Sequence, residues 1–94
     1  MSDAFEALAH PLRRELLERL QQEGELAAGE LAEQVDVSKP TLSHHLKVLT
    51  EAGLIDRERR GTFVYYRINQ SLLEEVVHKV FALMGVGAKD RKPA

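Results

Sequence analysis

The chain has 94 residues, of which 44% are hydrophobic, as suits one small globular domain with a thin core. It contains no cysteine, which excludes disulfides, thiolate metal sites and thiol redox chemistry. No apolar run approaches the roughly 20 residues that span a bilayer. The acidic N-terminus, MSDAFEALAH, lacks the basic and apolar regions of a signal peptide, so we expect a cytoplasmic protein without membrane contact.

The net charge of −2 hides an uneven distribution along the chain. Residues 1–37 hold three Lys or Arg against nine Asp or Glu, whereas residues 38–67 hold six against three. A polyanion senses charge within a Debye length of about 8 Å. The basic central segment therefore matters more for nucleic-acid binding than the acidic total.

The first half of the chain predicts four helices. Ser2 is placed to cap a short helix in which Phe5 and Leu8 share a face. Pro11 suits the first turn of a second helix, which Gly24 ends, and a short third helix is expected over residues 28–35. Ser38 then caps a fourth helix over residues 38–52, with Gly53 as its left-handed C-terminal residue.

After Gly53 the hydrophobic period changes from helical to two. Residues 55–59 and 62–68 are predicted strands, with Arg60-Gly61 as the hairpin turn. The alternation puts Phe63 and Tyr65 on one face and Tyr66 on the other. A last helix begins after Asn69 or Ser71 and reaches about residue 84, which closes a domain over residues 1–84. Residues 85–94 are predicted to form a disordered tail.

The predicted fold is mainly α with a small β-hairpin, in the order helix, helix, helix, helix, strand, strand, helix. Two short helices around a tight turn, followed by a hairpin, are typical of a winged helix-turn-helix. The recognition helix would be residues 38–52 and the wing residues 55–68.

This arrangement predicts a surface that contacts double-stranded DNA. Recognition helices present their N-terminal residues to the major groove, and hydroxyls bind phosphates. Wing arginines can lie along the backbone or in a narrow minor groove. The alternatives are a merely solvated helix face and arginines that keep an edge strand soluble. The expected DNA contacts are Ser38, Lys39, Pro40, Thr41, Ser43, His44, Lys47, Arg57, Arg59 and Arg60.

The adjacent histidines are unsuited to a shared metal ion, because helical neighbours diverge by about 100°. His45 falls beside Leu42, Leu46 and Leu49 and is predicted to be semi-buried with one or two hydrogen bonds. Glu75 and His78 could hold part of a site, but a solvated pair explains them more simply. We therefore predict no metal and no cofactor.

The chain resembles the ArsR-type winged-helix repressors from about Phe5 to Met84. The matching segments are AFEALAHPLRRELLERL at 4–20, ELAAGELAEQVDVSKPTLSHHLKVLTEAGLI at 25–55 and RRGTFVYYRIN at 59–69. Within that family it is most similar to the SdpR-like autorepressor subgroup. The family's arsenic and cadmium sensors carry cysteines where this chain has Ala27 and Gly29, so the resemblance implies DNA binding without that metal sensing.

A two-fold homodimer is also expected. The apolar stripe of the last helix has no obvious cover within one chain of 94 residues. The resemblance implies an interface between first and last helices, at Phe5, Leu8, Leu72, Val76, Val80 and Phe81.

The resulting hypothesis is a dimeric repressor that binds a palindromic operator and acts on its own promoter. One alternative adds an effector or a metal at a non-cysteine site in the dimer interface. Another is a winged helix that binds protein, for which a neutral or acidic recognition helix would be typical. An enzyme is not expected, because no glycine-rich phosphate loop or catalytic triad is present.

Overall fold

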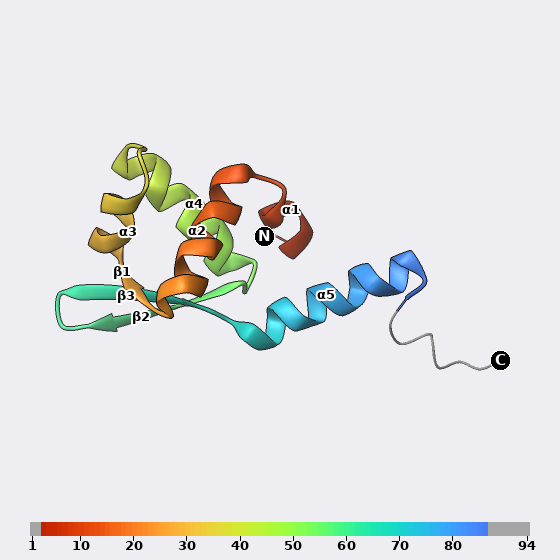
Figure 1. Ribbon diagram of the computed structural model, residues 1–94. Coiled ribbons are helices and arrows are strands. Elements are labelled where there is room, and N and C mark those ends of the chain that lie inside the picture. The colour runs from red at the N-terminus through yellow and green to blue at the C-terminus, as the bar shows by residue number, and fades with distance from the viewer. Residues whose placement is uncertain (1–2, 87–94) are drawn as a thin grey trace.

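The computed structural model describes residues 3–86. Figure 1 shows a helical body beside a small sheet, with the last helix projecting away from both. The predicted winged helix-turn-helix is confirmed. Ser2 and most of the expected tail, from residue 87 on, lie outside the described residues. The elements are α1 Ala4–Leu8, α2 Pro11–Glu23, β1 Leu26–Ala27, α3 Ala28–Gln34, α4 Lys39–Glu51, β2 Ile55–Arg60, β3 Phe63–Ile68 and α5 Gln70–Met84.

Side chains fix the start of four helices. The cap of α1 is Asp3 rather than the expected Ser2, since its carboxylate accepts from the Glu6 amide at 2.8 Å. His10 caps α2 through its ring nitrogen Nδ1, which accepts from the Leu12 amide at 3.1 Å. Ser38 caps α4 as predicted, and Asn69 caps α5. Each cap satisfies an amide that has no partner inside its helix.

The core is made of aliphatic side chains from α2, α3, α4 and the start of β2. Six of them are less than 2% exposed: Leu16, Leu20, Leu31, Leu49, Leu54 and Ile55. Leu42 and Leu46 extend this cluster along α4, which buries one face of that helix and leaves the other in solvent. Core packing therefore fixes the position of α4 in the molecule.

The sheet contains one strand that the sequence did not predict. β1 pairs antiparallel with β3, with Leu26 opposite Tyr66, so the strand order is β1-β3-β2. The hairpin turn also differs by one residue, because Arg60 pairs with Phe63 and leaves Gly61-Thr62 as the loop. The φ of 63° at Gly61 explains the register, since tight hairpin turns favour a glycine with positive φ at the first position.

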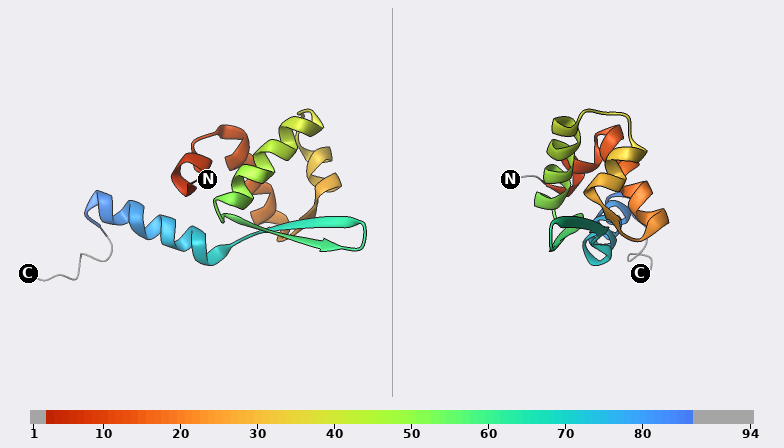
Figure 2. Two further views of the ribbon diagram at one scale, coloured as in Figure 1. Left: turned by 180° about the vertical axis from the view of Figure 1, so that it is seen from behind. Right: turned by 90° about the vertical axis from the view of Figure 1, so that its left-hand side faces the viewer.

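A single residue, Asn69, connects β3 to α5. Its amide donates to the Leu54 carbonyl at 2.9 Å, and its side chain accepts from the Leu72 amide at 3.1 Å. The first bond holds the connection against Leu54, which follows α4, and the second caps α5. Beyond it, α5 extends as an arm, which the left view of Figure 2 shows from behind and the right view shows nearly end-on.

His45 is more deeply buried than the predicted semi-buried position and lies at the junction of α1, α2 and α4. It is 7% exposed, and Nη1 of Arg13 lies 3.1 Å from its Nδ1. A guanidinium can only donate, so Nδ1 accepts and Nε2 carries the proton of the neutral ring. Arg13 also donates to the Ala7 and Glu6 carbonyls, and the His10 ring lies 4.4 Å from the His45 ring. Burial, followed by the charges of His10, Arg13 and His44, lowers the pKa of His45.

This environment predicts a loss of stability in acid. The folded protein holds His45 neutral, so the unfolded chain binds more protons as the pH falls below about 6.5, the ordinary pKa of an imidazole. Stability from this source is therefore complete above that pH and declines below it. In His45→Asn, which keeps an acceptor but does not titrate, the free energy of unfolding should fall less between about pH 7 and pH 5. Urea titrations at each pH measure this. His78→Asn, an exposed change on α5, should keep the wild-type pH dependence; identical slopes in all three proteins would contradict the assignment.

Gly53 is required for its conformation and for its contact with α5. Its φ is 82°, and a β-carbon there would lie 2.9 Å from Cδ2 of Leu72. Gly53→Ala should cost at least about 1–2 kcal/mol in the free energy of unfolding, because an L side chain is strained in the left-handed region. Gly29→Ala is the matched control, since open space surrounds Gly29 in helix α3. Urea denaturation at one protein concentration compares them, and equal midpoints for the two variants would refute this role.

Candidate nucleic-acid interface

Helix α4 displays polar residues on the side opposite its buried leucines. The seven residues expected to contact DNA from this helix and its cap, Ser38, Lys39, Pro40, Thr41, Ser43, His44 and Lys47, are all exposed. Their common exposure follows from the burial of Leu42, Leu46 and Leu49, which share the other face. The helix therefore carries two lysines, three hydroxyls and an imidazole into solvent from a fixed position.

The cap of α4 also orients a hydroxyl. Oγ of Ser38 accepts from the Thr41 amide at 3.3 Å and donates to Oγ1 of Thr41 at 2.9 Å. The Ser38 proton is thus used within the helix, whereas the Thr41 hydroxyl keeps its own proton for an external acceptor. A hydroxyl donor at a helix N-terminus suits a phosphate oxygen.

Strand alternation divides the three wing arginines between two faces. Arg57 and Arg59 alternate with Glu58 and Arg60 along β2. Arg57 pairs with the buried Tyr66, so Arg57 and Arg59 share the face that α4 adjoins. Arg60 lies on the opposite face, beside Tyr65.

Arg60 is held on that opposite face by two carboxylates. It donates to both oxygens of Glu25, at 2.7 and 2.8 Å, and to Glu58 at 2.9 Å. Its guanidinium carbon lies 4.3 Å from the centre of the Tyr65 ring. Arg67 adds a bond to Glu58 at 3.1 Å. The hydrogen bonds from Arg60 and then from Arg67 lower the pKa of Glu58 to about 2, so this network stays charged throughout the neutral range.

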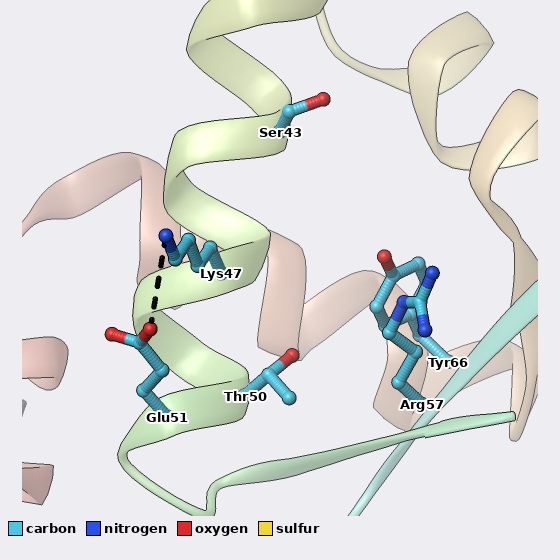
Figure 3. Close-up of a pocket in the computed structure, with 6 residues that line it drawn as sticks. All are labelled: Ser43, Lys47, Thr50, Glu51, Arg57 and Tyr66. Atoms are coloured by element: carbon cyan, nitrogen blue, oxygen red, sulfur yellow. Dashed lines mark ion pairs between the residues drawn. The ribbon is translucent and has the colours of Figure 1, made fainter.

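A cavity of about 370 Å³ separates α4 from the base of the wing (Figure 3). Nζ of Lys47 lies 3.9 Å from Oε2 of Glu51, at the limit of an ion pair, and the Lys47 side chain is 73% exposed. The Thr50 hydroxyl donates to the Leu46 carbonyl at 2.7 Å. The side chains with charged donors on the two walls are Lys47 on α4 and Arg57 on the wing. The lining residues are Ser43, Lys47, Thr50, Glu51, Arg57 and Tyr66.

Within residues 3–86, no group of three or more His, Asp or Glu residues is arranged to hold a metal ion. The rings of His44 and His45 are 5.2 Å apart, but His44 is exposed and His45 is buried. The two histidines therefore lie in different environments, His44 in solvent and His45 in the core.

The residues expected at a dimer interface fall into two groups. Val76 is only 6% exposed, and Leu8 and Leu72 are half-buried against the core of the same protomer. Phe5, Val80 and Phe81 are exposed, at 46%, 37% and 43%. Three further side chains on α5 are exposed: Val77 and Met84, which belong to the apolar stripe predicted from the sequence, and Leu83, which the prediction did not include. The pattern of one helix could not show which part of its stripe its own chain would cover.

The comparisons with known proteins agree with this geometry. Residues 8–58 match a helix-turn-helix domain. The chain is 36% identical to the transcriptional repressor SdpR of Bacillus subtilis (strain 168), across 96% of this chain and 99% of that protein. It is 38% identical to the arsenical resistance operon repressor of the same organism, across 88% and 83%.

A solved structure shares the fold over nearly the whole chain. It is the crystal structure of a possible transcriptional regulator for arsenical resistance, with a TM-score of 0.78, 35% identity, and coverage of 97% of this chain and 93% of that one. Among the helices of residues 3–86, none has the length and apolarity to cross a lipid bilayer. The fold, the exposed basic face and these likenesses together show that the chain belongs to the ArsR family of DNA-binding helix-turn-helix transcriptional repressors, which are not enzymes.

Proposed function

We propose that the protein is a homodimeric repressor that binds a palindromic operator, including one at its own promoter. The observation that carries this proposal is that Ser43 and Lys47 of α4 and Arg57 of the wing line one cavity, with Arg59 on the same face of the wing as Arg57. Repression would be steric, by covering the promoter. The action on its own promoter rests on the resemblance to the SdpR-like autorepressors.

The exposed residues of this surface have two proposed roles. Phosphate contacts, which give most of the affinity and set the register, fall to Ser38, Lys39, Thr41, Arg57 and Arg59. Base edges in the major groove fall to side chains further along α4, where Pro40 adds an apolar contact. These base-reading candidates are Ser43, His44 and Lys47.

Arg60 has a different proposed role, although its sequence position suggested a DNA contact. Its donors are engaged by Glu25 and Glu58 on the face of the wing that points away from α4. We therefore assign Arg60 to holding the wing against the segment before β1, so that Arg57 and Arg59 meet the DNA in a fixed position.

The homodimer is supported by the exposed apolar side chains of α5. Isolated exposed hydrophobic residues are common, but a row of them on one projecting helix marks an interaction surface. A symmetric dimer would cover the row and would match half-sites about 34–36 Å apart.

Phe81→Glu should convert the dimer to a monomer, because it places a charge in the middle of the proposed interface. Size-exclusion chromatography with light scattering measures the mass directly. His78→Glu, an exposed polar position on the same helix, should stay dimeric. A wild-type monomer at micromolar concentration, or a dimeric Phe81→Glu variant, would contradict the interface.

The function is tested by fluorescence anisotropy on the chain's own upstream DNA and on a scrambled duplex, over a series of salt concentrations. Tight binding to the first duplex with a steep salt dependence is expected. Arg59→Ala should reduce the slope of log K against log salt by about 0.9, as one phosphate contact does. Arg60→Ala should leave that slope unchanged, because this side chain releases no counterion from DNA. Equal, weak binding to both duplexes would reject the promoter assignment, and equal slope losses would return Arg60 to the contact surface.

A further inference from the structure

The buried Tyr66 has a hydroxyl group that the fold itself does not use. The residue is 8% exposed, yet among the hydrogen bonds of residues 3–86 none involves its Oη. In the same part of the chain no side-chain polar atom is both sealed from solvent and unpaired. The Tyr66 oxygen is therefore open to solvent, and Tyr66 lines both this cavity and a second one beside Ala28 and Lys39. Buried tyrosine hydroxyls usually find a partner, so this one is placed for a partner from outside.

The cavity has the donors and the charge to take an anion. Lys47 and Glu51 line the cavity from α4, where the Lys47 ammonium turns toward Glu51, and Arg57 brings a positive charge from the opposite wall. Ser43 is exposed at its rim and can donate a hydrogen bond. Figure 3 shows four of the side chains on α4, with Arg57 and Tyr66 together across the space. The Thr50 proton is already used on the Leu46 carbonyl, so Thr50 is not a donor here.

The position of the cavity indicates the source of the anion. A recognition helix in the major groove and a wing in the neighbouring minor groove have between them the sugar-phosphate strand that separates the two grooves. In this chain the space between α4 and the wing is the cavity itself. The strand must therefore pass its mouth when both elements are engaged.

We propose that this cavity is a phosphate-binding site for the DNA backbone, in which the Tyr66 hydroxyl donates to a phosphate oxygen beside Arg57. The inference rests on the proposed function and assigns it one specific contact. Tyr66 thus has two roles: its ring packs in the core, and its hydroxyl contacts the bound DNA strand. Glu51 repels the phosphate and pairs with Lys47 on the side of α4 that is turned away from Arg57.

The test compares Tyr66→Phe with Tyr65→Phe, a neighbouring tyrosine on the other face of the wing. Anisotropy titrations use the upstream duplex over a salt series, and urea titrations check that both variants fold. Tyr66→Phe should weaken binding about tenfold, as expected for a lost hydrogen bond to a charged group, while Tyr65→Phe should not. The salt slope of Tyr66→Phe should equal that of the wild type, because a neutral hydroxyl displaces no counterion. Arg57→Ala should weaken binding and also reduce the slope by about 0.9.

Glu51→Gln gives an independent prediction of opposite sign. Removing the carboxylate beside the phosphate should tighten binding, and no purely structural role of Tyr66 would produce that result. Equal affinities of the two tyrosine variants, or weaker binding by Glu51→Gln, would overturn the proposal while wild-type binding leaves the proposed function intact. Failure of the wild type to bind any duplex would instead reject the proposed function.

Inorganic phosphate, added to the free protein at ionic strength matched with chloride, distinguishes the source of the anion. In a thermal shift titration, added phosphate should change the Tm of the wild type and of Tyr66→Phe by the same amount. Protection of the wild type alone, with equal DNA affinities, would show a site for free phosphate and would overturn the assignment to the DNA backbone.

Discussion

The burial of one face of α4 is the constraint on which the rest of the molecule depends. Leu42, Leu46 and Leu49 belong to one core cluster with the aliphatic side chains of α2, of α3 and of the start of β2. Since these leucines cannot leave the core without a large loss of apolar burial, the opposite face of the helix must point into solvent. The surface proposed to meet DNA is therefore a consequence of core packing, which also holds it in a fixed position.

The wing is controlled by a second constraint, the alternation of side chains along a strand. Because successive residues of β2 point to opposite faces, the three arginines cannot act as one patch. Arg57 and Arg59 lie on the face of the wing next to α4. Arg60 lies over the Tyr65 ring on the other face and donates to Glu25, which precedes β1. Exposed ion pairs contribute little to stability individually, but a bidentate pair within a network restricts geometry. This network joins the hairpin to the segment between α2 and α3.

Much of the fold could be predicted because its signals are local. Pro11, Gly24, Ser38 and Gly53 mark helix boundaries that the structure reproduces, and the change of period after Gly53 predicts the hairpin. β1 was missed because two residues cannot display an alternation. The partner of Arg60 was missed because Glu25 lies 35 residues away, and only the pairing of β1 with β3 brings them together. The Tyr66 hydroxyl gave no signal, since its place in an apolar alternation already explained the residue.

The connection through Asn69 has a mechanical consequence. β3 ends at Ile68 and α5 begins at Gln70, so one residue, bonded through its amide to Leu54 and through its side chain to Leu72, separates the wing from the arm. A connection of one residue with both of these bonds leaves the chain little freedom to bend there. A tilt of the arm relative to the body would therefore act on β3 and, through Leu54, on the segment that follows α4. A partner that held the arm would in this way also influence the angle of the wing.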